Sequence, residues 1–598
     1  MKPAGCVLAA AFAAAFVLTP RAARAEQSAK RAVALSLAAP DSVALSDLPQ
    51  ITPQEAAAEL RAPARARLHG VPMQQYALLK AQAATVKLPA PKGAVPQPLI
   101  AAGPLPPPAT GPSATKITGF GGLGLACGHE IPPDMALAAG PRFVLQVING
   151  CVTVFDKSGN VRSGFPKSLS SLMLVGPAAQ AAPYDPRALF DWANQRYIVS
   201  AAHLNAAREA VLDVAVSQSS NPLGIWFIYH LNMSAGTNPI LTTGQLADFP
   251  TLGQDRRMIY VAFNAFTGDI FNGAFMLLLN KSAMYAGASF NFFGLEPSFF
   301  TLPSGEVMDS LQPANVMDRT DNPRAEFVVA SHNINATGGP GCASGCSDVA
   351  VFAISNPAFT FNPADPGPEV SQVLVNTSDT YSSPPLAPQP TCSTLACLID
   401  TGDTRVSGEV IYASGSLYAA LDTNGTGNGA SAAHILWFQI RPVLNDNDPA
   451  CTSLPNQCPQ IVGASVLNEV CWACATGQGD GTGAAYYPEV QPDPEGDVLV
   501  VFNYSDDNIF PSSAYATDRA TEALGTMHDS GFFLQQGLAT YEILDTNKIN
   551  RWGDYTAASL DLTPGTQASF WFAGESSKTA TAYRTAIGHN QFKGPGEP

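Results

Sequence analysis

This sequence is poor in charged residues. Only 13% of its 598 residues are Asp, Glu, Lys or Arg, and the formal net charge is −16. It has no run of Lys and Arg, which excludes the basic surface on which nucleic-acid binding depends. No apolar run beyond the N-terminus is long enough to span a bilayer. We therefore expect no nucleic-acid partner and no membrane span.

Familiar catalytic sequence patterns are also missing. No Gly-x-Ser-x-Gly stretch is present, which argues against an α/β-hydrolase. No His-Glu-x-x-His pattern occurs, and the eight histidines are scattered without metal-ligand spacing. Three readings stay open: a binding protein, a purely structural protein, and an enzyme with dispersed carboxylates, such as a glycosidase.

The N-terminus has the features of an export signal. Lys2 precedes an apolar run over residues 7–18, and Ala23-Arg24-Ala25 fits a cleavage site. We predict a signal peptide over residues 1–25 and a secreted or periplasmic location. Residues 26–116 are rich in Ala and Pro, which predicts a flexible segment or a pro-region.

Cysteine usage agrees with export. Removing Cys6 with the signal leaves ten of the eleven cysteines, an even number. In an oxidising compartment close neighbours become loop disulfides. The pairs expected from their spacing are 127 with 151, 342 with 346, 392 with 397, 451 with 458, and 471 with 474. The last pair also fits a redox motif or half a zinc site, but a structural disulfide is favoured.

Fifty glycines and fifty prolines indicate many turns and short strands. Asn149-Gly150 joins apolar runs at residues 143–147 and 152–155, which is a strong hairpin signal. Similar units of a polar turn and several short strands recur along the chain. They begin near residues 133, 184, 248, 312, 402, 487 and 551.

The recurrence predicts an all-β fold, a β-propeller over residues 117–598. Seven blades are favoured. Six or eight also fit, because the fourth unit is weak, and a pair of β-sandwiches is the rival fold. Cys-rich loop insertions are expected at about 380–400 and 442–485. Residues 119–124, with four glycines, are expected to form an entry turn rather than a nucleotide site.

Several stretches resemble a group of uncharacterised secreted bacterial β-propeller proteins, which are distantly similar to sialidases. The stretches are Asp185-Pro186-Arg187, 217–226, 248–253 and 551–555. The resemblance covers about residues 117 to 592. The 217–226 run is similar to the Asp-box hairpin of sialidases but lacks its Asp, and the Asp box is itself a folding element. The resemblance therefore implies a fold and no agreed activity.

Three arginines occupy first-strand starts, where propeller blades line one mouth of the central channel. Arg187, Arg405 and Arg551 stand beside Asp185, Asp403 and Asp554 respectively. Converging guanidiniums would hold a ligand carboxylate, because each offers a planar fork of donors. The alternative is that each arginine pairs with an aspartate of its own or the next blade and closes the ring.

The sialidase-like resemblance implies a tyrosine nucleophile and carboxylates beside such an arginine cluster. In this sequence Tyr555 is the candidate nucleophile, with Tyr184 and Tyr487 as alternatives, and Asp248 or Glu489 is the candidate carboxylate. The bare sequence gives no carboxylate separations, so it does not distinguish catalysis from structure.

Two oxygen-rich stretches are candidate calcium sites. They contain Asp422 and Asn424, and Asp446 and Asp448, as the candidate ligands. Calcium prefers such side chains, yet neither stretch has the closing Glu of the twelve-residue calcium loop. Ordinary turns are the favoured reading, and no cofactor is required.

These observations lead to one main functional hypothesis and one alternative. The main hypothesis is an exported propeller that acts as a binding or scaffold module for an extracellular glycan or protein. The alternative is a sialidase-like glycoside hydrolase that acts on an acidic sugar.

Overall fold

The computed structural model describes most of the chain beyond residue 113. Described are residues 33–52, 54, 65–66, 80, 83 and 114–592, apart from 237–238, 319, 333–344, 356–366, 393, 428–429, 446–458, 473–482, 526, 528–530 and 546–547. The predicted signal peptide, the calcium candidates Asp446 and Asp448, and both members of the predicted 451–458 cysteine pair lie outside the described residues.

The described chain is almost entirely β-structure, arranged as seven successive antiparallel units. Unit 1 contains β6 (Ala136–Ala139), β7 (Phe143–Ile148), β8 (Cys151–Asp156) and β9 (Lys167–Ser168); unit 2 contains β10 (Tyr184–Asp191), β11 (Arg196–Leu204), β12 (Ala210–Ser217) and β13 (Ile225–Asn232); unit 3 contains β14 (Leu246–Gln254), β15 (Met258–Thr267), β16 (Ile270–Asn280) and β17 (Phe290–Leu295); unit 4 contains β18 (Gln312–Val316), β19 (Glu326–Ser331), β20 (Cys346–Ser355) and β21 (Glu369–Tyr381).

The last three units complete the series. Unit 5 contains β22 (Val410–Ala413), β23 (Ser416–Gly427), β24 (Ala430–Leu444) and β25 (Ile461–Trp472); unit 6 contains β26 (Ala484–Pro492), β27 (Val498–Ser505), β28 (Ser512–Asp518) and β29 (Phe532–Gln535); unit 7 contains β30 (Ala557–Asp561), β31 (Ser569–Thr579), β32 (Ala582–Gln591) and, from the N-terminal side, β4 (Thr115–Gly124).

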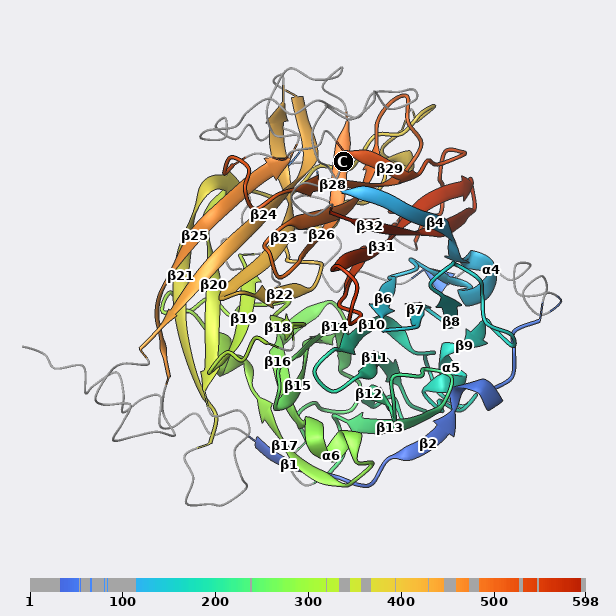
Figure 1. Cartoon of the computed structure of the whole chain (residues 1–598), viewed down its shortest axis with the longest axis vertical. Coiled ribbons are helices and arrows are strands. Elements are labelled where there is room, and N and C mark those ends of the chain that lie inside the picture. Colours follow the sequence, from blue (N-terminus) through green and yellow to red (C-terminus); the bar gives the residue numbers. More distant parts are fainter. Residues whose placement is uncertain are drawn as a thin grey trace, which may run out of the picture.

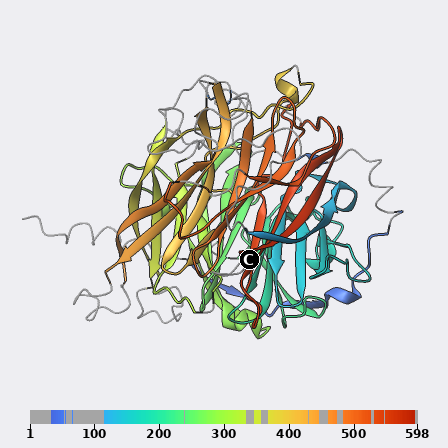
Figure 2. The ribbon, with the colours of Figure 1, turned by 45° about the horizontal axis from the view of Figure 1, so that its top comes forward.

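Figure 1 shows the first strands β6, β10, β14, β18 and β22 toward the middle of the molecule and the later strands of each unit farther out. In the tilted view of Figure 2 the sheets stand side by side. Short parallel pairings join β14 to β18 and β18 to β22, so the sheets of units 3 to 5 are continuous at the centre.

The inner strands are buried on both faces: successive side chains on a strand point to opposite faces, and β10 and β26 are buried at every position. On β7, Val144 and Ile148 pack in a cluster with unit 7, whereas Leu145 and Val147 pack in a cluster with unit 2. Seven such apolar clusters each join neighbouring units, including unit 7 with unit 1. The first and last units are therefore in contact.

The strand β4 brings the start of this region against its end. It pairs antiparallel with β32 (Figure 1). The expectation of an entry turn over residues 119–124 was wrong, because these residues belong to β4. Their glycines permit close approach: a Cβ on Gly122 would lie 2.4 Å from Thr585 Oγ1 and 2.6 Å from Gln146 Oε1.

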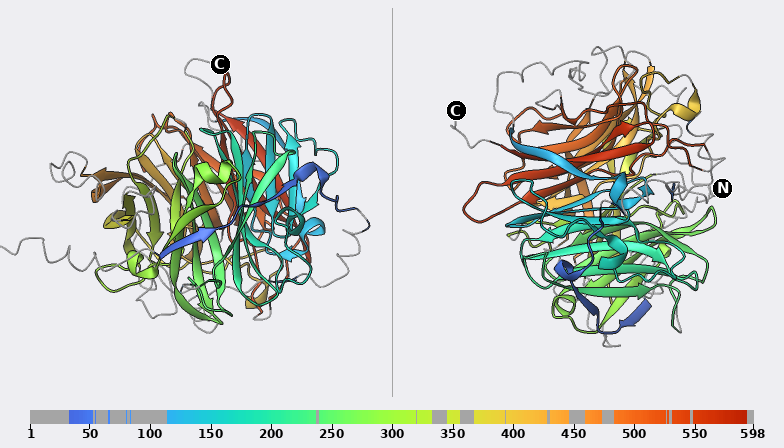
Figure 3. Two further views of the ribbon diagram at one scale, coloured as in Figure 1. Left: turned by 90° about the horizontal axis from the view of Figure 1, so that it is seen from below. Right: turned by 90° about the vertical axis from the view of Figure 1, so that its right-hand side faces the viewer.

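Two strands from the 26–116 segment lie on the outside of the molecule. β1 (Val33–Leu37) pairs with β17, and β2 (Asp41–Ala44) pairs with β13, each as an additional outer strand. Figure 3 shows them crossing units 2 and 3. In this part of the segment the prediction of a flexible chain was wrong, because regular backbone pairing fixes both strands.

The strands predicted from local patterns are confirmed in every unit, including the hairpin of β7 and β8 at Asn149-Gly150. One insertion was placed wrongly, since Ile461–Trp472 within the 442–485 stretch forms β25.

Two disulfides are confirmed, with Cα–Cα distances of 5.8 Å for Cys127–Cys151 and 5.6 Å for Cys392–Cys397. Within the described residues, no helix has the length and apolar character needed to cross a membrane.

Candidate functional site

Residues within or shortly before the first strands share an unusual backbone. Asp134, Asp185, Phe249, Ser310, Gly402 and Tyr487 all have positive φ, between 40° and 62°. Such a conformation costs a non-glycine residue about 1–3 kcal/mol and persists only where neighbouring contacts fix it. In β10, β14 and β26 it coincides with a bulge in the pairing register.

The contacts that fix these turns run from unit to unit. Backbone N–H groups of one unit donate to side-chain oxygens of a neighbouring unit. The pairs are Asp185 to Asn149 at 2.8 Å, Phe249 to Asp185 at 3.1 Å, Ser310 to Asn264 at 2.8 Å, Tyr487 to Asp422 at 2.7 Å and Asp554 to Asp134 at 2.8 Å. The recurring polar turn of the sequence is thus the link between neighbouring units.

A cluster of charged side chains, here called the central charge cluster, surrounds these turns. Its cations are Arg187, Arg405 and Arg551, and its acids are Asp134, Asp185, Asp248, Asp400, Asp403, Asp422, Asp554, Glu409 and Glu489. The three arginines, Asp248 and Glu489 of the catalytic candidates named from the sequence belong to this cluster. Tyr555 contacts it through Arg187, Tyr487 donates its N–H to Asp422, and the Tyr184 hydroxyl donates to the Ala247 carbonyl.

Arg405 and Arg551 are engaged by carboxylates. Arg405 holds Asp403 with both arms of its fork, at 2.7 Å from Nε and 2.6 Å from Nη2. Arg551 donates to Asp400 at 2.8 Å and to Asp554 at 3.0 Å. Asp400 precedes unit 5 and Arg551 precedes unit 7, so this ion pair joins separate parts of the chain.

Arg187 has a different environment. It donates to the carbonyl oxygens of Pro250 at 3.2 Å and Ser407 at 3.1 Å, and its guanidinium lies 3.5 Å from the ring centre of Tyr555. The Tyr555 hydroxyl donates to the Pro186 carbonyl at 2.9 Å, and burial raises its pKa well above the usual range. Arg187 is thus held by backbone oxygens and an aromatic face.

Burial raises the pKa of several acids of the cluster. Burial raises the pKa of Asp248 to about 7, with Asp185 adding to the rise and Arg405 opposing it. Burial and the neighbouring Glu409 raise the pKa of Glu489 well above its usual range, and burial raises that of Glu409 to about 7. Such perturbed carboxyls occur in active sites and in buried structural networks alike.

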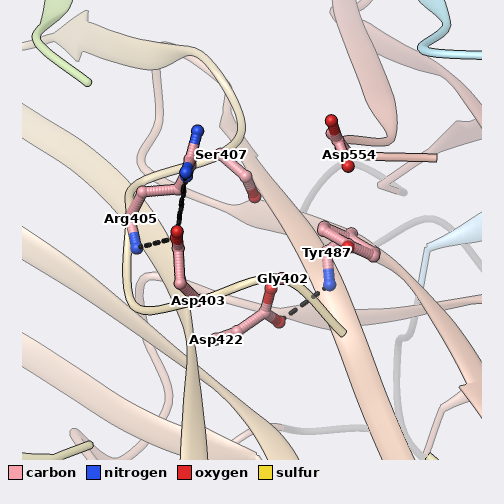
Figure 4. Close-up of a pocket in the computed structure, with 7 residues that line it drawn as sticks. All are labelled: Gly402, Asp403, Arg405, Ser407, Asp422, Tyr487 and Asp554. Carbon is pink, nitrogen blue, oxygen red and sulfur yellow. Dashed lines mark hydrogen bonds and ion pairs between the residues drawn. The ribbon is translucent and has the colours of Figure 1, made fainter. Parts of the chain in front are cut away.

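The space within the cluster is small. Figure 4 shows a cavity lined by Asp403, Arg405, Asp422, Tyr487 and Asp554, among others. Its volume of about 10 Å³ is about the room that one water molecule needs. A sugar ring therefore does not fit here without rearrangement of the paired side chains.

The calcium candidates that the structure describes lie on a strand. Asp422 and Asn424 belong to β23, so the interpretation of this stretch as a loop was wrong. Asp422 accepts the Tyr487 N–H, and Asn424 Nδ2 donates to the Ala83 carbonyl at 2.8 Å. Among the described residues no group of three or more His, Cys, Asp or Glu side chains is arranged to hold a metal ion.

A larger cavity lies on the outside, between β1, β13 and β17. This outer groove has a volume of about 450 Å³, within the range typical of small-ligand sites. Its walls include the apolar Leu35, Leu37 and Phe292, and its polar groups include His230 and Asn232. The groove thus combines apolar surface with a few hydrogen-bonding groups.

A chain of hydrogen bonds orients His230. Its Nδ1 lies 2.7 Å from Asp213, which is fully buried and also lies 2.8 Å from Nδ1 of His203. The hydrogen bond that His230 donates to Asp213 raises the pKa of His230 above its ordinary value, with Asp41 adding to the rise. One buried carboxylate thereby fixes a partly exposed imidazole at the groove.

A second histidine is clamped between carboxylates. His332 lies 2.9 Å from Glu306 and 2.7 Å from Asp348, and these bonds, chiefly the one to Glu306, raise its pKa from 6.5 to about 9. Because the folded-state pKa is raised, the stabilisation is complete below pH 6.5 and is lost as the pH rises through about 9.

We expect the His332→Gln variant to lose about 1–2 kcal/mol of unfolding free energy relative to wild type at pH 6, and little at pH 10. The whole pKa shift corresponds to about 3 kcal/mol, and exposure of the site to solvent reduces it. Urea unfolding of both proteins at the two pH values measures the difference. An equal loss at both pH values would show that the ion pairs are not its source.

Several residues of these sites carried no sequence signal. The sequence analysis did not predict Asp134, Asp400 or Glu409 as site residues. Asp134 and Asp400 are nevertheless buried acids in the polar turns before first strands. The groove beside His230 forms because β1 pairs with the distant strand β17, and nothing in the sequence near His230 indicates this pairing. Lys80, buried beside Asp400, lies in a segment predicted to be flexible.

No family model matches this chain, and no curated protein matches it. Among solved structures it is similar to an ulvan lyase of polysaccharide lyase family 25 (11% identity, 74% of this chain and 89% of that chain, TM-score 0.33), a complex of Drosophila Plexin A with Semaphorin 1b (7%, 80% and 88%, 0.31), and a subtype N10 neuraminidase-like protein of A/little yellow-shouldered bat/Guatemala/060/2010 (7%, 62% and 91%, 0.29). Likeness at this level assigns no activity to this chain.

Proposed function

We propose that this chain is an exported seven-bladed β-propeller that binds an extracellular glycan or protein. The seven units are its blades, and β4 closes the ring against β32. The folded domain takes in residues 117–598, and the signal peptide residues 1–25. The segment 26–116 is then more than a spacer, because β1 and β2 extend two of the blades.

The observation that carries the binding role is the outer groove. It is the larger of the two cavities described above, and its apolar walls with the oriented His230 suit a short stretch of sugar or peptide. Leu35 and Leu37 on β1 contribute part of its wall. The groove is therefore completed by the N-terminal segment.

The glycosidase alternative has weaker support. Its arginine clamp requires free guanidinium forks, whereas Arg405 already binds Asp403 and Arg551 already binds Asp400 and Asp554. A ligand carboxylate would have to displace those acids. The feature in its favour is Asp248, whose pKa of about 7 would suit a general acid.

We expect the Ala235→Trp variant to lose ligand binding by at least about tenfold, because Ala235 lines the groove and an indole would fill it. The experiment probes arrays of glycans and of peptides with the labelled full chain, and measures the affinity of each retained compound. Ala580→Trp is the matched control, since Ala580 is exposed on the turn between β31 and β32.

Retention of compounds by wild type and by Ala580→Trp, but not by Ala235→Trp, supports the proposal. If Ala235→Trp bound the same compounds as wild type with equal affinity, the groove would not be the binding site. Hydrolysis of an arrayed sialoside, lost in the Asp248→Asn variant, would replace the binding role by the glycosidase.

A further inference from the structure

A lysine from the N-terminal segment is inserted beside the central charge cluster. Lys80 is only 6% exposed, and its Nζ donates to the Pro384 carbonyl at 2.9 Å and to Thr401 Oγ1 at 2.8 Å. Ala83, also buried, accepts a hydrogen bond from Asn424 Nδ2. The segment is thus attached to unit 5 and the chain that leads into it at these two residues.

The receiving side is built to accept N–H donors. The Thr401 hydroxyl donates its single proton to the Pro385 carbonyl at 2.9 Å, so toward Lys80 its oxygen acts as an acceptor. The Pro384 carbonyl is the second acceptor. Asp400, Asp403 and Asp422 lie close enough to favour the charged form of the amine, which offsets part of the desolvation; the pKa of Lys80 is about 8. These groups all come from residues 384–422.

The geometry suits an ammonium group better than other cations. Two acceptors converge on one nitrogen at 2.8–2.9 Å. A compact ammonium group can satisfy both, because its three N–H donors share one nitrogen. A guanidinium would present a planar fork, which pairs best with a parallel pair of acceptors. A quaternary ammonium has no N–H to donate.

We propose that the pocket filled by Lys80 is a recognition site for a primary ammonium group, and that a lysine side chain of a protein partner takes it when Lys80 withdraws. Lys80 is then the resident occupant of the site. This inference rests on the proposed binding role and specifies the chemistry of one ligand, a lysine-bearing protein.

The test is chemical rescue in the full-length Lys80→Ala variant. Adding n-butylammonium chloride is expected to raise its Tm by about 2 °C or more relative to sodium chloride at the same ionic strength, because the amine binds only the folded pocket. Tetramethylammonium and guanidinium should have no such effect. Lys578→Ala, which removes an exposed lysine of β31, is the matched control and should not respond to the amine.

Binding in trans is measured by calorimetry with Nα-acetyl-lysine methylamide. We expect binding to Lys80→Ala that is at least about tenfold tighter than to wild type, where Lys80 competes. Thr401→Val in the Lys80→Ala background should remove it, and the norleucine analogue of the probe, which lacks the ammonium, should not bind. Equal responses of Lys80→Ala and Lys578→Ala to amines would overturn the inference.

If Lys80→Ala does not fold, wild type gives the answer. Acetylation of the native protein, followed by mass spectrometry, should modify Lys80 at least about tenfold more slowly than Lys578, and butylammonium should remove part of that protection. Equal labelling rates, or protection unaffected by the amine, would overturn the inference. Loss of the amine response with intact binding in the outer groove would leave the proposed function standing.

Discussion

Replacing Arg551 by Met should lower the free energy of unfolding by about 3–5 kcal/mol. Arg551 has a side-chain exposure of 1%, and it holds Asp400, which is completely buried. Methionine keeps most of the volume but leaves that carboxylate without its cation. Urea unfolding followed by tryptophan fluorescence measures the loss.

The matched control is Arg162→Met, because Arg162 is exposed and its removal leaves no buried acid. Its effect should stay within about 0.5 kcal/mol. A similarly small effect for Arg551→Met would mean that the buried ion pair contributes little to holding unit 7 against the chain before unit 5.

The Lys281→Met variant should also lose about 3–5 kcal/mol, for the same physical reason at a different contact between units. Lys281 follows β16 in unit 3, and its Nζ lies 2.8 Å from Asp191 at the end of β10 in unit 2. The Gln254 side chain and the Asp255 carbonyl also accept from it. Both members of the ion pair are buried.

The carboxylate here depends on its partners. Burial alone would raise the pKa of Asp191, but Lys281, with Tyr285 and Asn194, holds it below the usual value. Without Lys281, the buried Asp191 carboxylate either keeps its charge without a cation beside it or becomes protonated. The measurement is again urea unfolding, with Lys578→Met as the exposed control; a second variant, Lys281→Met with Asp191→Asn, should recover part of the loss. No recovery would contradict the ion-pair explanation.

The strands were predictable where their signals are local. The hairpin of β7 and β8 has Asn149-Gly150 between two apolar runs, and the first-strand turns repeat a recognisable polar pattern. The ion pairs of Arg405 with Asp403 and of Arg551 with Asp554 join residues two and three positions apart, which the sequence placed side by side.

Long-range partners could not be predicted in this way. β4 pairs with β32 at the other end of the domain, and its four glycines gave no sign of a strand; one of them, Gly122, allows close approach to Thr585 and Gln146. The same holds for β1, which lines the outer groove, for β2, and for Lys80. Each of these features depends on contacts between segments that lie far apart in the chain.

We infer that the side chains of the central charge cluster bind one another and stabilise the fold. A ligand would then bind at another site, or would have to displace these side chains. Arg551 and Asp400 carry this claim most clearly, since their bond of 2.8 Å joins two separate parts of the chain in a buried setting.

The most direct test is a double-mutant cycle of Arg551→Met and Asp400→Asn, with each free energy of unfolding measured in urea. We predict that the double variant is more stable than the sum of the single losses implies, by about 2–3 kcal/mol, because Arg551→Met leaves the buried Asp400 without this ion pair and Asp400→Asn leaves Arg551 with the carboxylate of Asp554 but without that of Asp400. Additive losses, within about 0.5 kcal/mol, would contradict the account and would make Arg551 available for a ligand.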